Sequence, residues 1–408
     1  MVILKDKVFI FILIISFFIR LAVALLPGFK IDIEDWAAWA IRLNETGFNH
    51  FYSQQVFTDY TPGYLYVLNI IGWIRESFIL NNFIFFYLLK IPAIISEILI
   101  GIIIYQEIFR SLNRKAATIA AAIILFNPAL IFNSSLWGQV DSVSTLFVLL
   151  TIISLKKNKL IISSLFFSVA FLIKPQTAII FPVLIYFIIK NFSFKNLLKL
   201  FFPALLLTYL LSLPFFPIQT LTNLIQHITN SANVYPYNSL FAYNFWGAIG
   251  FWANDNQLFG SFNFKEWGIL LLVGYLIILT YFYFKKNINL YSMTALICLG
   301  FFFLPTRVHE RYLYPAIPLL VLAGAYLKSK IIYLLTLILC FIHFLNLYYV
   351  YIYYNEFYFN LPKTIYNPMV YNFLGEQSKN LSVLSTILFI LIFVIVIKDS
   401  YENKKIQS

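Results

Sequence analysis

Residues 156–190 read KKNKLIISSLFFSVAFLIKPQTAIIFPVLIYFIIK, two apolar runs that meet at Lys174-Pro175-Gln176 and carry lysines at both outer ends. If both lysine-bearing ends face one compartment, the runs form a hairpin with Lys174 at its tip. Each leg of about 14 residues is about 21 Å long as an α-helix, shorter than a hydrocarbon core of about 30 Å. Lys174 would then lie below the outer headgroups, which a lysine tolerates only in a hydrated, protein-lined cavity. The hairpin therefore predicts a helical membrane protein with a cavity open to the outside.

The composition of the whole chain also indicates a membrane protein. The 408 residues are 61% hydrophobic and 11% charged, which exceeds what a soluble core of this size needs. The net charge of +12 does not indicate nucleic acid, because most lysines lie in short clusters between apolar segments. Apolar stretches recur at 8–26, 83–109, 116–132, 143–155, 160–173, 176–189, 200–216, 268–284, 288–305, 313–327, 331–350 and 381–397. We predict an all-α polytopic membrane protein of about 12 transmembrane helices, forming one domain over residues 1–408.

Alternate connections between these stretches hold most of the cations, which sets the topology. They contain 18 of the 29 lysines and arginines: Lys5, Lys7, Arg110, Arg114, Lys115, Lys156, Lys157, Lys159, Lys190, Lys195, Lys199, Lys285, Lys286, Lys328, Lys330, Lys398, Lys404 and Lys405. The positive-inside rule makes these connections and both termini cytoplasmic. The external face then receives a first loop at 27–82, a long loop at 217–267, the segment 351–380 and the turn at 307–311. It also receives 12 of the 17 acidic residues.

The first external loop contains a candidate catalytic acid. Its sequence GFKIDIEDWAAWAIRLNETGFNHFY predicts an amphipathic helix at 33–43 that lies at the membrane interface, with Trp36 and Trp39 as anchors. The stretch GYLYVLNIIGWI is too short to span comfortably and predicts a second interfacial segment. Asp32 precedes the first helix at a position typical of an N-cap. It is either a capping residue or a general base at the mouth of the cavity, and residue type leaves both readings open.

Two further polar clusters lie on the predicted external face. The stretch SSLWGQVDS places Trp137, Gln139 and Asp141 at a helix end, where serine capping with a tryptophan in the aromatic belt is the simpler alternative. The turn RVHER contains Arg307, His309, Glu310 and Arg311. Its structural alternative is a Glu310–Arg311 pair with a snorkelling Arg307, but that leaves His309 unexplained. Arginines beside a histidine suit a phosphate diester.

One acid lies inside an apolar run. Glu97 falls in the middle of the stretch 83–109 and is either a proton relay or the partner of a buried cation or backbone group; we favour pairing. The sequence contains no Walker motif, glycine-rich phosphate loop or metal-spaced cysteine and histidine set.

Six motifs, taken in order, resemble those of membrane glycosyltransferases with the GT-C fold. They are DIEDWAAWA, DYTPGYLYVL, LWGQVDS, KPQ, NSLFAYNFWG and RVHERYLYPAIP, and they span roughly residues 30–320. They are most similar to prokaryotic relatives of the mannosyltransferases of glycosylphosphatidylinositol-anchor assembly. The dolichyl-phosphate-glucose-dependent glucosyltransferases share the DYxP and HE+ patterns. Thr61 stands where these relatives commonly have a second proline, and the helices in 331–408 carry no motif of this kind.

The resemblance implies an inverting glycosyltransferase that takes one hexose, mannose or glucose, from a polyprenyl-phosphate donor on the external face. The membrane would be the cytoplasmic membrane of a prokaryote, and the acceptor a glycan, a lipid or a protein. Asp32 would be the catalytic base, and Lys174, Arg307, His309 and Arg311 would bind the donor phosphate. The residues expected to shape the site are Asp59, Tyr60, Trp137, Gln139, Asp141, Gln176, Asn244 and Glu310. The chemistry requires no cofactor and no metal, because the leaving group is already a phosphate, although Asp32 with Asp141 could bind a metal ion.

Two other classes of protein compete with this interpretation. A ligase or polymerase of lipid-linked glycans would also have cationic external loops, but it would transfer whole oligosaccharides from a pyrophosphate. A transporter or flippase would usually show an internal repeat with discontinuous helices in matched positions. The two halves of this chain show no such symmetry.

Overall fold

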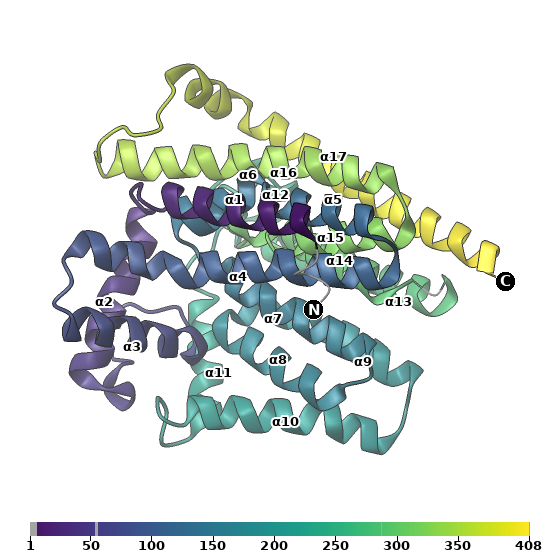
Figure 1. Ribbon diagram of the computed structural model, residues 1–408, viewed down its shortest axis with the longest axis horizontal. Coiled ribbons are helices and arrows are strands. Elements are labelled where there is room, and N and C mark those ends of the chain that lie inside the picture. Colours follow the sequence, from purple (N-terminus) through teal and green to yellow (C-terminus); the bar gives the residue numbers. More distant parts are fainter. Residues whose placement is uncertain (1–5, 54–55, 287, 408) are drawn as a thin grey trace. The chain divides into compact units, whose positions relative to one another are not determined.

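The computed structural model describes residues 6–53, 56–286 and 288–407, and helices form nearly all of its secondary structure (Figure 1). In chain order the helices are α1 (Lys7–Val23), α2 (Lys30–Thr46), α3 (Pro62–Ser77), α4 (Asn82–Ser111), α5 (Arg114–Leu125), α6 (Pro128–Ile131), α7 (Asp141–Lys156), α8 (Leu160–Ile173), α9 (Phe181–Lys190), α10 (Phe194–Ser212), α11 (Thr220–Ser231), α12 (Phe245–Ile249), α13 (Phe264–Lys286), α14 (Leu290–Phe303), α15 (Ala316–Leu327), α16 (Lys330–Tyr351) and α17 (Pro368–Gln407). Short helical turns η3 (Phe132–Trp137), η4 (Pro175–Ile180), η5 (Glu310–Leu313) and η6 (Ile352–Tyr358) extend or join them. Strands β1 (Leu258–Phe259) and β2 (Phe262–Asn263) form one small hairpin.

Helices form most of each apolar stretch found in the sequence, which confirms a polytopic, all-α membrane protein. Within the described residues, α4, α10, α13, α17 and α16 with η6 are long and apolar enough to cross a membrane. A sixth candidate span is the bent pair of α5 with α6 and η3. The remaining apolar helices, such as α8 and α14, are shorter than a bilayer requires. Twelve crossings therefore stay a prediction. The segment 351–380, expected to be a connection, already contains the first turns of α17.

Contacts between Cα atoms divide the chain into two compact units, which we describe separately. Unit 1 comprises Met1–Arg20, Glu97–Asn133 and Tyr235–Ser408, and unit 2 comprises Leu21–Ser96 and Ser134–Val234. Each unit is therefore built from segments that are far apart in the sequence. The single domain over residues 1–408 stays a prediction.

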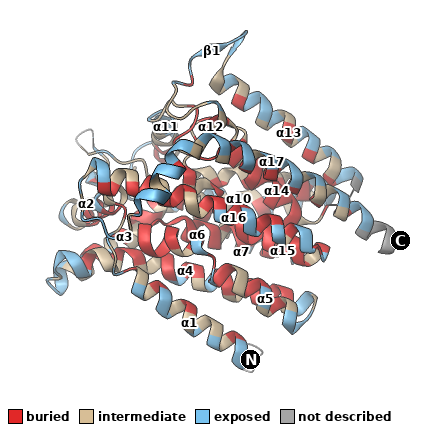
Figure 2. Ribbon diagram, turned by 90° about the horizontal axis from the view of Figure 1, so that it is seen from above, coloured by how far each residue is buried: buried red, intermediate tan, exposed pale blue. Residues whose placement is uncertain are grey.

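The core of unit 1 lies on α14 and α15, which are buried along nearly their whole length (Figure 2). Helix α16 packs against α15 on one side and against the long α17 on another. A buried ion pair also lies in this unit, where Arg20 Nη2 is 2.9 Å from Glu97 Oε1 and both side chains are fully buried. Arg20 donates further to the carbonyl oxygens of Ser16 (3.1 Å) and Leu125 (2.8 Å). The predicted pairing of Glu97 with a cation is confirmed.

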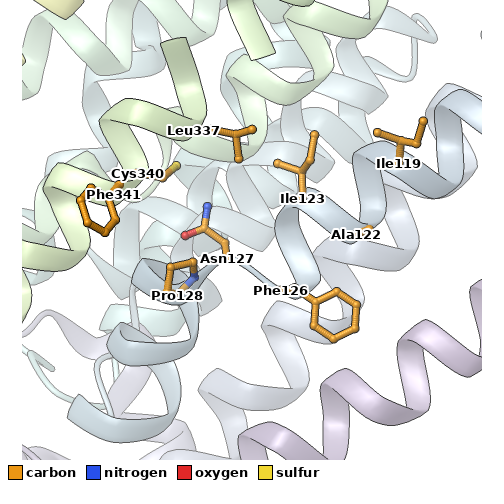
Figure 3. Close-up of a pocket in the computed structure, with 9 residues that line it drawn as sticks. All are labelled: Ile119, Ala122, Ile123, Phe126, Asn127, Pro128, Leu337, Cys340 and Phe341. Atoms are coloured by element: carbon orange, nitrogen blue, oxygen red, sulfur yellow. The ribbon is translucent and has the colours of Figure 1, made fainter. Parts of the chain in front are cut away.

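A bend in the α5–α6 span produces an apolar groove in unit 1. The two parts meet at an angle of 43°, where Pro128 starts α6 and the Asn127 side chain accepts hydrogen bonds from the N–H groups of Ala129 and Leu130. The groove has a volume of about 520 Å³ and lies between the bend and α16 (Figure 3). Its lining consists of Ile119, Ala122, Ile123, Phe126, Asn127, Pro128, Leu337, Cys340 and Phe341. This lining suits hydrocarbon chains and not a charged substrate.

In unit 2, α2 packs against α3 and buries its aromatic face inside the protein. Trp36 and Trp39 are only 1% and 2% exposed, and both rings contact the ring of Tyr60. The indole N–H of Trp39 donates to the carbonyl oxygen of Phe57 at 3.0 Å. The interpretation of both tryptophans as interfacial anchors is therefore wrong. The apolar stripe of α2 is covered by neighbouring protein segments instead of lipid.

The start of α3 and the end of α8 approach each other closely, and this brings the DYTP and KPQ motifs together. A methyl group on Gly63 would lie 2.4 Å from the carbonyl carbon of Leu172, so only glycine fits at this position. The hydroxyl of Thr61 donates to the carbonyl oxygen of Leu172 at 2.7 Å. Thr61 is thus accommodated by a hydrogen bond where relatives commonly carry proline. Helix α8 then ends at Ile173, directly before Lys174.

Candidate functional site

Asp32 lies within the first turn of α2 and is held by two hydrogen bonds from another part of unit 2. Its Oδ2 accepts from Nε1 of Trp137 at 2.7 Å and from Nε2 of Gln139 at 2.6 Å. The N-cap of α2 is Phe29, which provides no side-chain cap. The capping interpretation of Asp32 is therefore wrong. Trp137 is fully buried, so its assignment to the aromatic belt is wrong as well.

The turn that carries both donors depends on a glycine. Gly138 has a φ of +89°, a left-handed conformation that side chains rarely adopt, and it separates Trp137 from Gln139. The chain before α2 is joined to this turn by a hydrogen bond from the N–H of Phe29 to the carbonyl oxygen of Trp137 at 3.0 Å. The Phe29 and Trp137 rings also stack with centroids 4.1 Å apart. These contacts fix the turn beside the start of α2, where Asp32 lies.

Gln139 links Asp32 to the buried lysine of the hairpin. Its Oε1 accepts from Lys174 Nζ at 3.1 Å and from the hydroxyl of Tyr60 at 3.2 Å. Lys174 also forms an ion pair with Asp141 Oδ1 at 2.5 Å, and both of these side chains are buried. The structure thus unites Asp32, Tyr60, Trp137, Gln139, Asp141 and Lys174 in one network. The charge of Lys174 is compensated by Asp141.

The same region contains an acidic cluster of Asp32, Glu34, Asp35 and Asp59. Asp59 and Gln176 are half-buried, as is Asp35. Burial, followed by the neighbouring charges of Asp32, Asp59 and Glu34, raises the pKa of Asp35 from 3.8 to about 7. The spacing of Asp32 and Asp35 by three residues on a helix is the signal that could have revealed this repulsion.

The raised pKa of Asp35 predicts a specific dependence of stability on pH. A carboxyl group whose folded-state pKa is raised contributes stability below its unfolded pKa near 4, and this contribution is lost as pH rises through about 7. We expect Asp35→Asn to unfold at a higher temperature than the wild type at pH 8, with the difference vanishing near pH 4. Thermal unfolding in detergent at several pH values measures this. Glu45→Gln, which neutralises an exposed acid of the same helix that does not contribute to the raised pKa of Asp35, is the matched control. An equal rise in the unfolding temperature of Asp35→Asn at pH 4 and pH 8 would show that ionisation of Asp35 is not the cause.

In unit 1, Arg307 forms a buried ion pair that the sequence did not indicate. Its Nε and Nη2 donate to the two oxygens of Asp255 at 2.7 and 3.1 Å, and Thr306 donates to the same carboxylate at 2.9 Å. Asp255 is fully buried. Arg307 therefore does not snorkel. It also adopts a φ of +63°, uncommon for a residue other than glycine, and its N–H donates to the carbonyl oxygen of Tyr237.

The other arginine of the 307–311 turn also has its charge paired with a carboxylate. Arg311 Nη1 lies 3.0 Å from Glu310 Oε1 and 3.3 Å from His309 Nδ1, so the predicted Glu310–Arg311 pair is present. The backbone of His309 pairs with Leu240 and Phe241 of the long loop. This explains its place in the turn without assigning chemistry to its ring.

Asn244 has a structural position in unit 1. Its side-chain oxygen accepts from the N–H of Gly247 at 3.0 Å, which caps α12, and its amide donates to the carbonyl oxygen of Phe302 at 2.9 Å. The side chain is fully buried. Asn244 thus fixes the loop that pairs with His309. Its expected role in shaping the substrate site stays a prediction.

Comparison with known families supports a glycosyltransferase. Residues 80–218 match the family model described as dolichyl-phosphate-mannose-protein mannosyltransferase, a family with the GT-C fold. The matched region includes Trp137, Gln139, Asp141 and Lys174. No curated protein matches the chain. The match confirms the resemblance to glycosyltransferases of the GT-C fold that the motifs indicated.

Proposed function

We propose that this protein, a membrane glycosyltransferase of the GT-C fold, transfers one hexose from a polyprenyl-phosphate donor to an acceptor with inversion at the anomeric carbon. The hexose is mannose or glucose, and the acceptor is a glycan, a lipid or a protein. Transfer takes place on the extracytoplasmic face of a prokaryotic plasma membrane. The observation that carries this proposal is the Asp32 carboxylate, which is oriented by Trp137 and Gln139 and joined through Gln139 to Lys174.

The geometry of Asp32 suits a general base. In the reaction, the acceptor hydroxyl attacks the anomeric carbon from the face opposite the phosphate. The bond between that carbon and the phosphate oxygen breaks, its electron pair leaves with the phosphate, and Asp32 takes the hydroxyl proton. Both hydrogen-bond donors bind Oδ2 of Asp32, so Oδ1 is the oxygen that receives the proton. Asp32 is half-buried and therefore accessible to a substrate. A positioned base of this kind contributes about 10²–10⁴-fold.

The leaving phosphate needs hydrogen-bond donors and no acid. We assign this role to Lys174 of unit 2, whose charge is paired with Asp141 and which would supply N–H donors with little net positive charge. The predicted phosphate-binding role of Arg307, His309 and Arg311 in unit 1 stays a prediction. Both of these arginines have a carboxylate partner, Asp255 or Glu310.

The cation distribution supports the extracytoplasmic face. The lysine-rich connections alternate along the chain, and Asp32 and the 307–311 turn fall on the opposite side by the positive-inside rule. Nucleotide sugars are cytoplasmic substrates that need a cytoplasmic catalytic domain, and the cytoplasmic connections are short.

The proposal is tested with the purified protein in liposomes and short-chain polyprenyl-phosphate mannose or glucose labelled in the sugar. A membrane extract provides glycan, lipid and protein acceptors. We expect the label of one of these donors to appear in an acceptor, joined in the anomeric configuration opposite to that of the donor. Retention of configuration would overturn the inverting mechanism. Consumption of a polyprenyl-pyrophosphate oligosaccharide in place of both monosaccharide donors would identify a ligase or polymerase instead.

A further inference from the structure

Lys90 is a buried lysine of unit 2 that the proposed mechanism does not use. It lies in the spanning helix α4, and its side chain is 1% exposed. Its ammonium donates to the carbonyl oxygens of Ala24 at 3.0 Å and Leu26 at 2.6 Å. An ionisable side chain inside the membrane is costly to keep, which makes it a candidate for function.

The position of Lys90 near the start of α4 would ordinarily be explained by snorkelling. A snorkelling lysine buries its methylene stem and extends its ammonium to the headgroups or to water. The ammonium of Lys90 is instead enclosed by protein and bound to the backbone of the chain between α1 and α2. Lys90 thus ties the segment that leads into α2 to the spanning helix α4.

The stem of Lys90 occupies the space that two glycines leave open. A methyl group on Gly28 would lie 3.3 Å from Lys90 Cε, and one on Gly138 would lie 3.2 Å from Lys90 Cγ. The methyl group on Gly138 would also lie 3.2 Å from Cδ1 of Ile33, the residue after Asp32. Optimal carbon contacts are about 3.5–4.0 Å long, so a methyl group at either glycine would require the lysine stem to shift slightly.

These contacts connect Lys90 to both segments that converge on Asp32. Gly28 precedes Phe29, whose N–H and ring both contact Trp137. Gly138 separates Trp137 from Gln139, the two donors to the Asp32 carboxylate. Lys90 therefore packs against the start of α2 on one side and against the donor turn on the other.

We infer that Lys90 is a positioning residue for sugar transfer, which fixes the start of α2 against the Trp137–Gln139 turn so that both N–H donors meet Asp32. This inference rests on the proposed role of Asp32. Lys90 is enclosed by protein and acts through Asp32, so it should influence the chemical step and leave donor binding nearly unchanged. A displacement of about 1 Å at a reacting group lowers the rate by about 10²-fold.

The inference is tested in the full-length protein with Lys90→Met, which keeps the stem and removes the ammonium. We expect kcat to fall by about 10- to 100-fold with the donor KM changed less than about 2-fold. Lys90→Arg, which retains a cation with several N–H donors, should recover part of the loss. Lys199→Met removes an exposed lysine of α10 in the same unit and is the matched control. Gly28→Ala keeps the ammonium and presses on the Lys90 stem and on Ile33, each at 3.3 Å. It should therefore lower kcat by a smaller factor even if Lys90→Met fails to fold.

Amide hydrogen exchange provides a readout that does not depend on activity. Exchange over residues 30–36 should become faster in Lys90→Met, while exchange in α8 stays the same. If the wild type transfers hexose and a folded Lys90→Met variant keeps the wild-type kcat, the inference is overturned and the proposed function still stands. If the donor KM of Lys90→Met rises by the same factor by which kcat falls, the positioning role is overturned as well. A wild type that transfers no hexose would refute the function, and faster exchange over 30–36 would still support the structural link.

Discussion

We expect Asp32→Asn to lower the kcat of sugar transfer in the purified protein by about 10²–10⁴-fold. Asparagine has the same shape as aspartate, and its amide oxygen can still accept the hydrogen bonds from Trp137 and Gln139. Its amide nitrogen then occupies the position of Oδ1, where it cannot take a proton. Transfer of labelled hexose from a polyprenyl-phosphate donor measures the loss.

The variant should fold and bind donor normally, since it keeps the surrounding network. Thermal unfolding and equilibrium donor binding check both points. Trp137→Phe is a graded comparison, because it removes one of the two donors to Asp32 and keeps the base, so it should lose less activity. Near-normal turnover of a folded Asp32→Asn protein would exclude Asp32 from the mechanism.

The second large effect concerns stability and the buried pair of Arg20 with Glu97. Replacing Glu97 by Leu leaves the guanidinium of Arg20 buried without its carboxylate, a change that costs about 3–5 kcal/mol when one member of a buried pair is removed. We therefore expect strongly reduced stability in Glu97→Leu, measured by equilibrium unfolding in detergent. The catalytic parameters of the fraction that remains folded should stay unchanged, because the pair lies in unit 1 and the Asp32 network in unit 2.

The double variant Arg20→Met with Glu97→Leu separates pairing from packing. Replacing a buried pair by apolar residues of similar volume is often neutral or stabilising, so the double variant should recover most of the loss. Equal destabilisation in the single and double variants would show that the two side chains contribute by packing alone. Loss of transfer in the fully folded double variant would instead support a proton-relay role for Glu97.

The sequence predicted the helices well because the apolar runs and their lysine-rich ends are local signals. Helix α8 begins and ends where the apolar run of 160–173 does. Glu97 was correctly assigned to an ion pair, since a lone acid in an apolar run requires a partner. The orientation of α2 was wrong. An amphipathic pattern shows that one face avoids water, but it does not show whether lipid or protein covers that face.

The site was predicted in part, for a related physical reason. The motifs identified Asp32, Trp137, Gln139 and Lys174, but the hydrogen bonds among these residues join positions 35 to 107 residues apart, which spacing does not reveal. Asp255 was missed because it lies 52 positions before Arg307 in the sequence. Lys90 was missed because its partners are backbone carbonyls, which leave no trace in residue type.

The division of the chain has a consequence for biogenesis. Unit 2 ends at Val234, whereas unit 1 requires residues up to the carboxyl terminus. As the ribosome moves along the message, all segments of unit 2 are translated before residues 235–408 have been made. Units generally fold as they are completed during synthesis. Asp32 and its two N–H donors, Trp137 and Gln139, can therefore assemble while the turn at 307–311 is still untranslated.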